Sequence, residues 1–171
     1  MTLNTVERQG VPIDEGTVLP EWIDVNEHMN VAYYVLAFDL AVDKLWQLFG
    51  IDERYIRDRR NSTFAVECHL TYQGEMNLGD PYVVAAQVLA YDEKRIHQIQ
   101  HMYHAEKGYL AATGEWMNLH IDMDTRRVTP WPDEIRAGIG RFVAEQGDWP
   151  LTSETGRKIQ VRNPLFSVER Y

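Results

Sequence analysis

The chain has 171 residues, and a single domain of this size removes about 70% of its unfolded surface from water, which is enough for one sizeable core. Hydrophobic residues make up 44% of the chain and charged residues 25%, so collagen-like, low-complexity and wholly disordered chains are excluded. The 17 basic and 26 acidic residues give a net charge of −9 without a long basic run, which argues against nucleic acid as a partner.

The chain carries no sign of export or of membrane insertion. Its one cysteine, Cys68, cannot form an internal disulfide, and the first ten residues have neither the basic start nor the apolar stretch of a signal peptide. The longest apolar segment, residues 31–49, contains Asp39, Asp43 and Lys44, which a membrane span would not tolerate. We therefore expect a single cytoplasmic domain.

The first half of the chain predicts a strand followed by a long helix. Residues 1–16 are expected to form an N-terminal arm, and residues 17–23 a strand that ends in a polar loop. Apolar residues then recur at alternating steps of four and three, which is the spacing of one helical face. This stripe comprises Val31, Val35, Phe38, Val42, Leu45 and Phe49. Further leucines lie off the stripe, so we expect burial on more than one side, and Gly50 is expected to end the helix.

The second half of the chain predicts a short helix, four strands and a last helix. The short helix is expected over residues 52–57, and the strands over 64–72, 82–91, 95–105 and 109–123. In the first of these strands the even positions are apolar, so Cys68 is expected to be an inert thiol in the core. Pro132 is expected to open a helix that runs to about residue 145, and residues 146–171 form a tail. Together these elements predict an α+β fold, in which an antiparallel sheet wraps around a long central helix.

The densest polar cluster lies where the first strand gives way to the long helix. It contains Asp24, Asn26, His28 and Asn30. Unpaired amides at the start of a helix stabilise negative charge on a carbonyl oxygen, and an imidazole beside them can move a proton. These are the parts of an acyl-transfer or hydrolysis site. The alternative interpretation is structural, with Asn30 as the helix cap, Asp24 as a turn residue and His28 on the surface.

The same segment resembles a known family. The string Asp24-x-Asn26-x-His28-Met29-Asn30 is similar to the Asp-x-Asn-x-His-Val-Asn motif of plant acyl carrier protein thioesterases, which belong to the hotdog-fold superfamily. Glu67-Cys68 resembles the Glu-Cys pair of those enzymes. Residues 20–24, 33–38, 64–80 and 113–120 resemble the bacterial betainyl-CoA thioesterases of carnitine degradation.

The resemblance implies hydrolysis of an acyl-CoA thioester at the start of the long helix, with betainyl-CoA split to glycine betaine and CoA and no cofactor. Asp24 would fix the loop, Asn26 would position the carbonyl or the water, and His28 would transfer the proton. Glu67 would be the base that activates water, although strand alternation points it away from the apolar face. The resemblance also implies a homodimer, or a dimer of dimers, with sheets joined edge to edge.

Aromatic and basic residues are candidates for holding such a substrate. A trimethylammonium group binds aromatic faces and carboxylates. The substrate-binding candidates are Asn30, Tyr34, Trp22 and Trp116, with Tyr33, Asp39 and Glu115 in suitable segments. The candidates for the CoA phosphates are Arg57, Arg59, Arg60, Lys94, Arg95, Arg126 and Arg127.

Other interpretations remain open at this stage. An enoyl-CoA hydratase on the same fold carries an Asp-x-Asn-Pro-x-His motif, but here the Pro is absent and the His comes one residue early. A non-catalytic acyl-CoA binding module is a third possibility. No metal site is predicted, because a strand places His97 and His101 on one face and His104 on the other.

Overall fold

The long apolar segment forms helix α1 (Val31–Phe49), as predicted. Asn30 caps its first turn, and Gly50 ends it with a left-handed φ of 96°, a conformation that glycine adopts without strain. Phe38, Leu45 and Phe49 of the predicted stripe are buried. Val31 and Val35 are exposed, because α1 is rotated so that other side chains face the sheet. The further buried residues of α1 are Tyr34, Ala37, Ala41 and Trp46.

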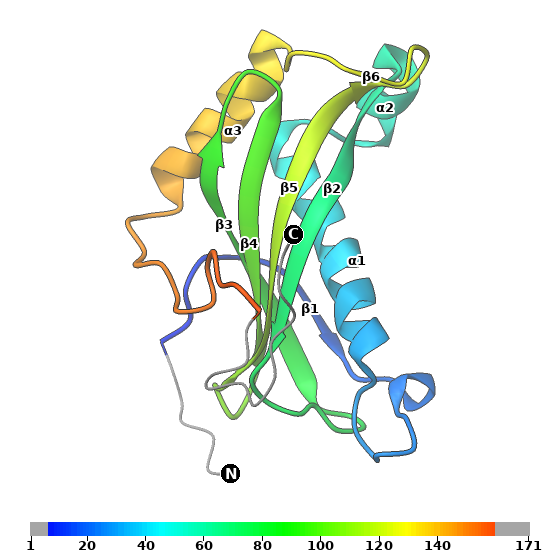
Figure 1. Cartoon of the computed structure of the whole chain (residues 1–171), viewed down its shortest axis with the longest axis vertical. Coiled ribbons are helices and arrows are strands. Elements are labelled where there is room, and N and C mark those ends of the chain that lie inside the picture. The colour runs from blue at the N-terminus through cyan, green and yellow to red at the C-terminus, as the bar shows by residue number, and fades with distance from the viewer. Residues whose placement is uncertain (1–6, 160–171) are drawn as a thin grey trace, which may run out of the picture.

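The computed structural model describes residues 7–159, which form a curved antiparallel sheet with α1 against its inner face (Figure 1). The strands are β1 (Val11–Thr17), β2 (Asn61–Tyr72), β3 (Pro81–Tyr91), β4 (Arg95–His104), β5 (Leu110–Asp122) and β6 (Arg127–Val128). Their order is β1-β3-β4-β5-β2, with β6 paired to the end of β5, so β2 lies at an edge. The four predicted strands are confirmed with small changes at their ends.

The predictions for the N-terminal region were wrong. Part of the expected arm is strand β1, which pairs with β3 from Val11 to Thr17. The expected strand over residues 17–23 is instead a single 3-10 turn, η1 (Pro20–Trp22). Proline has no N–H to donate to a sheet, and its fixed φ suits the first position of a turn, so Pro20 favours this outcome.

Two more helices complete the fold, α2 (Glu53–Arg59) and α3 (Asp133–Glu145). The predicted helices are therefore confirmed, each with slightly different ends. Helix α3 packs against the C-terminal half of α1, where Phe142 meets Phe49 with ring centroids 5.4 Å apart. Gly138 allows this approach, because a Cβ atom there would lie 2.4 Å from the Phe49 carbonyl oxygen. No helix among residues 7–159 has the length and apolar character needed to cross a membrane.

Strand β2 departs from the predicted alternation. A bulge between Ala65 and Glu67 shifts its register against β5 by one residue. A one-residue shift exchanges the two faces of a strand, so Phe64 does not share a face with Leu70. Cys68 is exposed rather than buried, because β2 is an edge strand that extends beyond the cover of α1. The prediction of a core thiol was therefore wrong.

Part of α1 stays uncovered within one chain. Val35, Leu36 and Leu40 are between 38% and 50% exposed, so the prediction of burial on more than one side does not hold for the single chain. Helix α1 packs against β1, β3 and β5 and stays farther from β2. This leaves a groove between α1 and the edge strand.

Candidate active site at the start of helix α1

The loop before α1 is a tight hairpin that closes on itself through backbone hydrogen bonds. Asp24 N–H donates to the His28 carbonyl at 3.1 Å, and Glu27 N–H donates to the Asp24 carbonyl at 3.0 Å. Glu27 lies in the left-handed region with a φ of 65°, which lets the chain reverse within a few residues. Met29 N–H donates to the Met76 carbonyl at 2.7 Å and so ties this hairpin to the loop after β2.

Asp24 and Asn30 hold the loop against the helix. One carboxylate oxygen of Asp24 accepts from the Asn26 backbone N–H at 2.8 Å, and the other accepts from the Asn30 side-chain amide at 3.2 Å. The Asn30 side-chain oxygen in turn accepts from the Ala32 N–H at 3.0 Å, which is an N-cap bond. These two residues have the positions that the structural interpretation of the sequence required.

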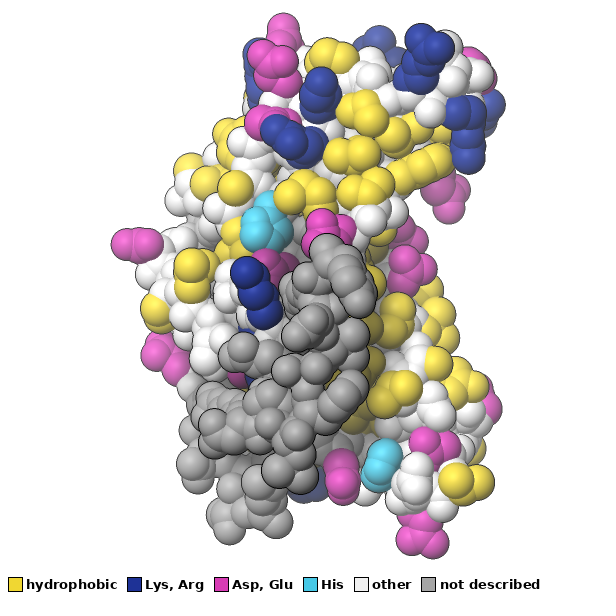
Figure 2. All heavy atoms as spheres, viewed as in Figure 1, with side chains coloured by type: hydrophobic (Ala, Val, Ile, Leu, Met, Phe, Trp, Pro, Cys, Tyr) yellow, Lys and Arg dark blue, Asp and Glu magenta, His cyan; other side chains and the backbone are white. Residues whose placement is uncertain are grey.

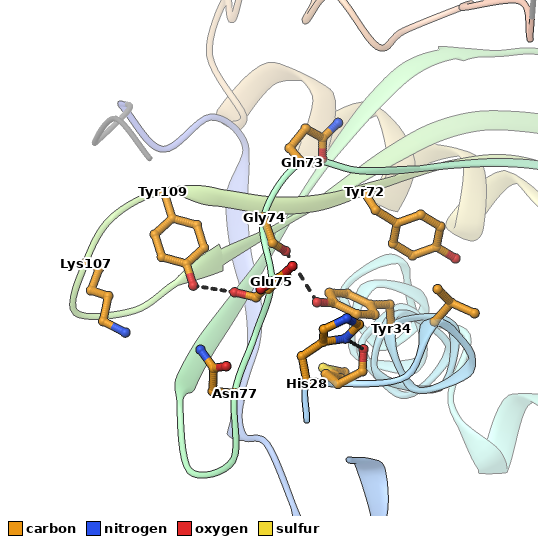
Figure 3. Close-up of a pocket in the computed structure, with 11 residues that line it drawn as sticks. His28, Tyr34, Tyr72, Gln73, Gly74, Glu75, Asn77, Lys107 and Tyr109 are labelled. Carbon is orange, nitrogen blue, oxygen red and sulfur yellow. Dashed lines mark hydrogen bonds between the residues drawn. The ribbon is translucent and has the colours of Figure 1, made fainter. Parts of the chain in front are cut away.

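A cavity of about 710 Å³ lies beside this end of α1 (Figure 3). We call it the tip cavity. Three segments form its walls, namely the start of α1 with its preceding loop, the loop after β2, and the turn between β4 and β5. The lining residues are His28, Met29, Val31, Tyr34, Tyr72, Gln73, Gly74, Glu75, Asn77, Lys107 and Tyr109.

His28 lines the tip cavity, and one of its ring nitrogens is hydrogen-bonded to the backbone. Its Nδ1 lies 3.3 Å from the Met29 carbonyl oxygen. A carbonyl oxygen can only accept, so in this bond Nδ1 carries the hydrogen and Nε2 keeps a lone pair. This tautomer has a free base nitrogen, which is what an imidazole needs to take a proton from water.

Tyr34 connects α1 to the opposite wall of the cavity. Its hydroxyl accepts from the Met76 backbone N–H at 3.1 Å and lies 3.4 Å from the Gly74 carbonyl, to which it donates. Tyr109 donates to the Glu75 carbonyl at 2.6 Å from the next turn. Burial raises the pKa of Tyr34 and of Tyr109 to about 12, so both remain neutral phenols.

Asp80 organises the rim of the tip cavity. Its carboxylate accepts from the backbone and side-chain amides of Asn77 at 2.8 and 3.2 Å, and it lies 3.3 Å from His104 and 3.5 Å from Lys107. Burial alone would raise the pKa of Asp80, but the Asn77 hydrogen bonds and the neighbouring His104 and Lys107 side chains lower it below its ordinary value. Asp80 therefore stays ionised and holds Asn77 and Lys107 at the rim.

The structure places the predicted site residues in different environments. His28 and Tyr34 line the tip cavity, and Asp24 and Asn30 support it from behind. Asn26 lies exposed in the hairpin turn. Trp22 is not at the cavity, because it is buried in the core, stacked on Tyr33 and Tyr82 with centroids 5.6 and 6.2 Å away.

Two further candidates lie away from the tip cavity. Trp116 packs on Phe38 in the groove under α1, with ring centroids 5.3 Å apart. Glu67 is exposed on the edge strand β2, opposite Met117 and outside the tip cavity. Within a single chain, Glu67 therefore does not reach the tip cavity that His28 lines.

The predicted phosphate-binding cations lie at the far end of the molecule. Arg57, Arg59 and Arg60 belong to α2 and its C-terminus, beyond the end of α1, and Figure 2 shows Lys and Arg side chains gathered there. Several pair with carboxylates, such as Arg59 with Glu134 at 3.1 Å and Arg60 with Asp124 at 3.0 Å. The 19 residues of α1 separate this end from the tip cavity, a rise of about 28 Å.

Sequence reasoning missed most of the far wall of the tip cavity. Gln73, Gly74 and Glu75 directly follow β2, and Tyr109 directly precedes β5. The sequence signal that they share is their position at the ends of predicted strands. In an antiparallel sheet these strand ends lie at the same end as the start of α1. Within residues 7–159, no three His, Cys, Asp or Glu side chains are grouped to hold a metal ion.

Comparison with known proteins identifies similar chains and folds. A family model described as the thioesterase-like superfamily matches residues 18–139. A betainyl-CoA thioesterase from Pseudomonas aeruginosa is 34% identical over 145 residues, covering 85% of this chain and 91% of the relative. An L-carnitine dehydrogenase/betainyl-CoA thioesterase from Rhizobium meliloti is 35% identical over 69% of this chain, which spans 24% of that longer protein.

Two solved structures are similar over most of the chain. A hypothetical protein from Staphylococcus aureus, determined in complex with CoA, has a TM-score of 0.85 and 28% identity, covering 92% of this chain and 100% of that one. A candidate thioesterase from Pseudomonas putida has a TM-score of 0.79 and 28% identity, covering 91% of this chain and 99% of the other.

Proposed function

The chain belongs to the thioesterase-like superfamily and is an acyl-CoA thioesterase, and we propose that it hydrolyses betainyl-CoA to glycine betaine and CoA in carnitine degradation. The observation that carries the proposal is the tip cavity, in which His28 and three tyrosines meet at the start of α1. The similarity to the Pseudomonas aeruginosa enzyme supports the choice of acyl group.

The proposed reaction uses the start of α1 to stabilise the thioester oxygen. The carbonyl oxygen faces the Val31 N–H at the positive end of α1, because Asn30 already accepts from the Ala32 and Tyr33 N–H groups. Negative charge is favoured at this end, and a well-placed donor contributes about 3 kcal/mol. His28 Nε2 takes a proton from water as the water oxygen bonds to the carbonyl carbon. The C–S bond then breaks, and the imidazolium returns its proton to the CoA thiolate.

The cationic acyl group would bind among the tyrosines of the tip cavity. A quaternary ammonium has no N–H to donate, so it is recognised by aromatic faces and nearby carboxylates. Tyr34 and Tyr72 meet edge to face with centroids 5.4 Å apart, and Tyr109 and Glu75 lie across the cavity from α1. This combination supports a small acyl group with a positive charge close to its carbonyl.

We propose that the enzyme is a cytoplasmic homodimer joined through β2. This strand is an edge whose Val66 is 56% exposed, and the exposed apolar residues of α1 lie beside it. Exposed edges and apolar faces of this kind favour pairing with a second chain. An antiparallel pairing of two β2 strands would bring the partner's α2 end, with its arginines, toward this chain's tip cavity. It would also give Glu67 a route to the partner's site.

A panel of acyl-CoA esters with a thiol reagent tests the reaction. The expected result is thiol release from betainyl-CoA at a much higher kcat/KM than from a long fatty acyl-CoA. Crotonyl-CoA distinguishes the hydratase alternative, because loss of its enoyl absorbance without free thiol would contradict hydrolysis. Saturable binding of betainyl-CoA without any turnover would also overturn the proposal.

The dimer is tested separately by light scattering after size-exclusion chromatography. The expected mass is about twice the 19.9 kDa of one chain. Val66→Arg is expected to lower that mass, because it places a charge at the edge of β2. A wild-type mass of one chain would refute the dimer.

A further inference from the structure

A second cavity lies in the groove between α1 and β2, one helical turn beyond the tip cavity. We call it the groove cavity, and its volume of about 50 Å³ leaves room for one small group. Its lining includes Phe38, Asp39, Gln98, Gln100, Trp116 and Asn118. The proposed reaction gives no role to any of them.

The floor of the groove cavity is made of side-chain amides with unsatisfied oxygens. Gln98 and Gln100 are 1% exposed and Asn118 is 5% exposed. The side-chain oxygen of each has no hydrogen-bond partner within the described part of the chain. The negative ends of three amide dipoles therefore lie together in a buried place, which favours positive charge beside them. A quaternary ammonium group supplies that charge through charge–dipole attraction and its C–H groups, although it donates no N–H hydrogen bond.

The rim of the groove cavity carries negative charge. The Asp39 carboxylate lines it from α1, and no basic residue lines it. The groove therefore combines neutral acceptors with negative charge.

Aromatic rings supply the walls. Phe38 and Trp116 meet edge to face with centroids 5.3 Å apart. The six-membered ring of the Trp116 indole lies against Gly114, where a Cβ atom would be 1.8 Å from the ring. Aromatic faces with acceptors and a carboxylate nearby form the kind of environment that binds a quaternary ammonium group.

The two cavities are in line along α1. Val31 and Tyr34 line the tip cavity, while Val35 and Phe38 line the groove cavity. A spacing of four residues corresponds to a rise of about 6 Å. A betainyl group has one methylene between its carbonyl and its nitrogen and is too short to bridge this distance, whereas three methylenes span it.

We propose that the groove cavity binds the trimethylammonium end of longer acyl groups, so that the enzyme also hydrolyses ω-trimethylammonium acyl-CoA esters with three methylenes between carbonyl and nitrogen. The inference relies on the proposed function for the position of the thioester at the tip cavity. The bond broken is the same C–S bond, and water supplies the oxygen.

The test compares each cationic ester with its neutral carbon isostere. The pairs are 4-(trimethylammonio)butyryl-CoA with 5,5-dimethylhexanoyl-CoA, and betainyl-CoA with 3,3-dimethylbutyryl-CoA. Within the longer pair, Asp39→Asn and Gln100→Leu are each expected to lower the cation-to-neutral ratio of kcat/KM by about tenfold. Asp43→Asn, one turn further along the helix, is the matched control and should leave that ratio unchanged. The ratio within the shorter pair should not respond to any of the three variants.

The outcomes separate the inference from the proposed function. An unchanged ratio for the longer pair in both Asp39→Asn and Gln100→Leu would overturn the groove cavity as a cation site. So would wild-type enzyme that hydrolyses betainyl-CoA and leaves the longer cationic ester intact. Hydrolysis of the longer ester with the expected shift, but not of betainyl-CoA, would support the inference and refute the betainyl assignment. No thiol release from either cationic ester would overturn both.

Discussion

Acid should destabilise this protein through one buried histidine, His101. It lies on the outer face of β4 with 0% of its surface exposed, and its ring stacks on Tyr103 with centroids 6.0 Å apart. Neither ring nitrogen has a hydrogen-bond partner among residues 7–159. Burial lowers the pKa of His101 to about 4, against the raising effect of Glu154, so the folded protein holds it neutral.

The size of the effect follows from the two pKa values. In the unfolded chain, His101 binds a proton as the pH falls through about 6.5, whereas in the folded protein it does so only near pH 4. The contribution of His101 to the free energy of unfolding is therefore constant above this range. It falls between pH 6.5 and 4, by about 3 kcal/mol at the lower limit. This is a large share of the stability of a typical domain. Burial also lowers the pKa of His120, which adds to the loss in the same direction.

Urea denaturation between pH 7.5 and 4.5, at one fixed protein concentration, measures this loss. His101→Gln should flatten the decline in the free energy of unfolding by about 2–3 kcal/mol over that range, whatever its stability at pH 7.5. His28→Gln, at a partly exposed position, is the control and should follow the wild type. Parallel curves for wild type and His101→Gln would refute the reasoning.

Three further substitutions test the supports of the two cavities. Asn30→Ala removes the N-cap of α1 and should cost about 1 kcal/mol in urea denaturation, so an unchanged midpoint would contradict the capping role. Tyr34→Phe leaves the buried Met76 N–H without its acceptor and should cost about 1–3 kcal/mol with a loss of thioesterase activity, and full activity would count against it. Gly114→Ala forces the Trp116 indole off the sheet, which should change tryptophan fluorescence and cost about 1–3 kcal/mol, and an unchanged spectrum would disprove the contact.

Most of the fold was predictable because its periodic signals are long and local. The apolar stripe over residues 31–49 and the alternation over residues 82–123 each extend over several turns or strands. Strand β1 escaped prediction because Pro12 and Gly16 interrupt its pattern and its partner, β3, lies far along the chain. The bulge after Ala65 escaped for a related reason, since its register is set by β5 rather than by β2 itself.

The candidate site was predictable only on one side. The polar loop before α1 is local in sequence, so its residues could be identified as a group, and His28 lines the cavity. The opposite wall, from Tyr72 to Asn77, has no distinctive motif and reaches the site through the order of the strands. Trp22 had a suitable residue type, but η1 turns it into the core.

The most direct test of proton transfer by His28 is the rate of thiol release from betainyl-CoA by His28→Ala. His69→Ala, a histidine of β2 outside the tip cavity, is the matched control. We predict that His28→Ala lowers kcat by about 10²–10⁴-fold with an unchanged melting temperature, while His69→Ala stays near the wild-type rate. A folded His28→Ala enzyme that releases thiol at the wild-type rate would contradict the account.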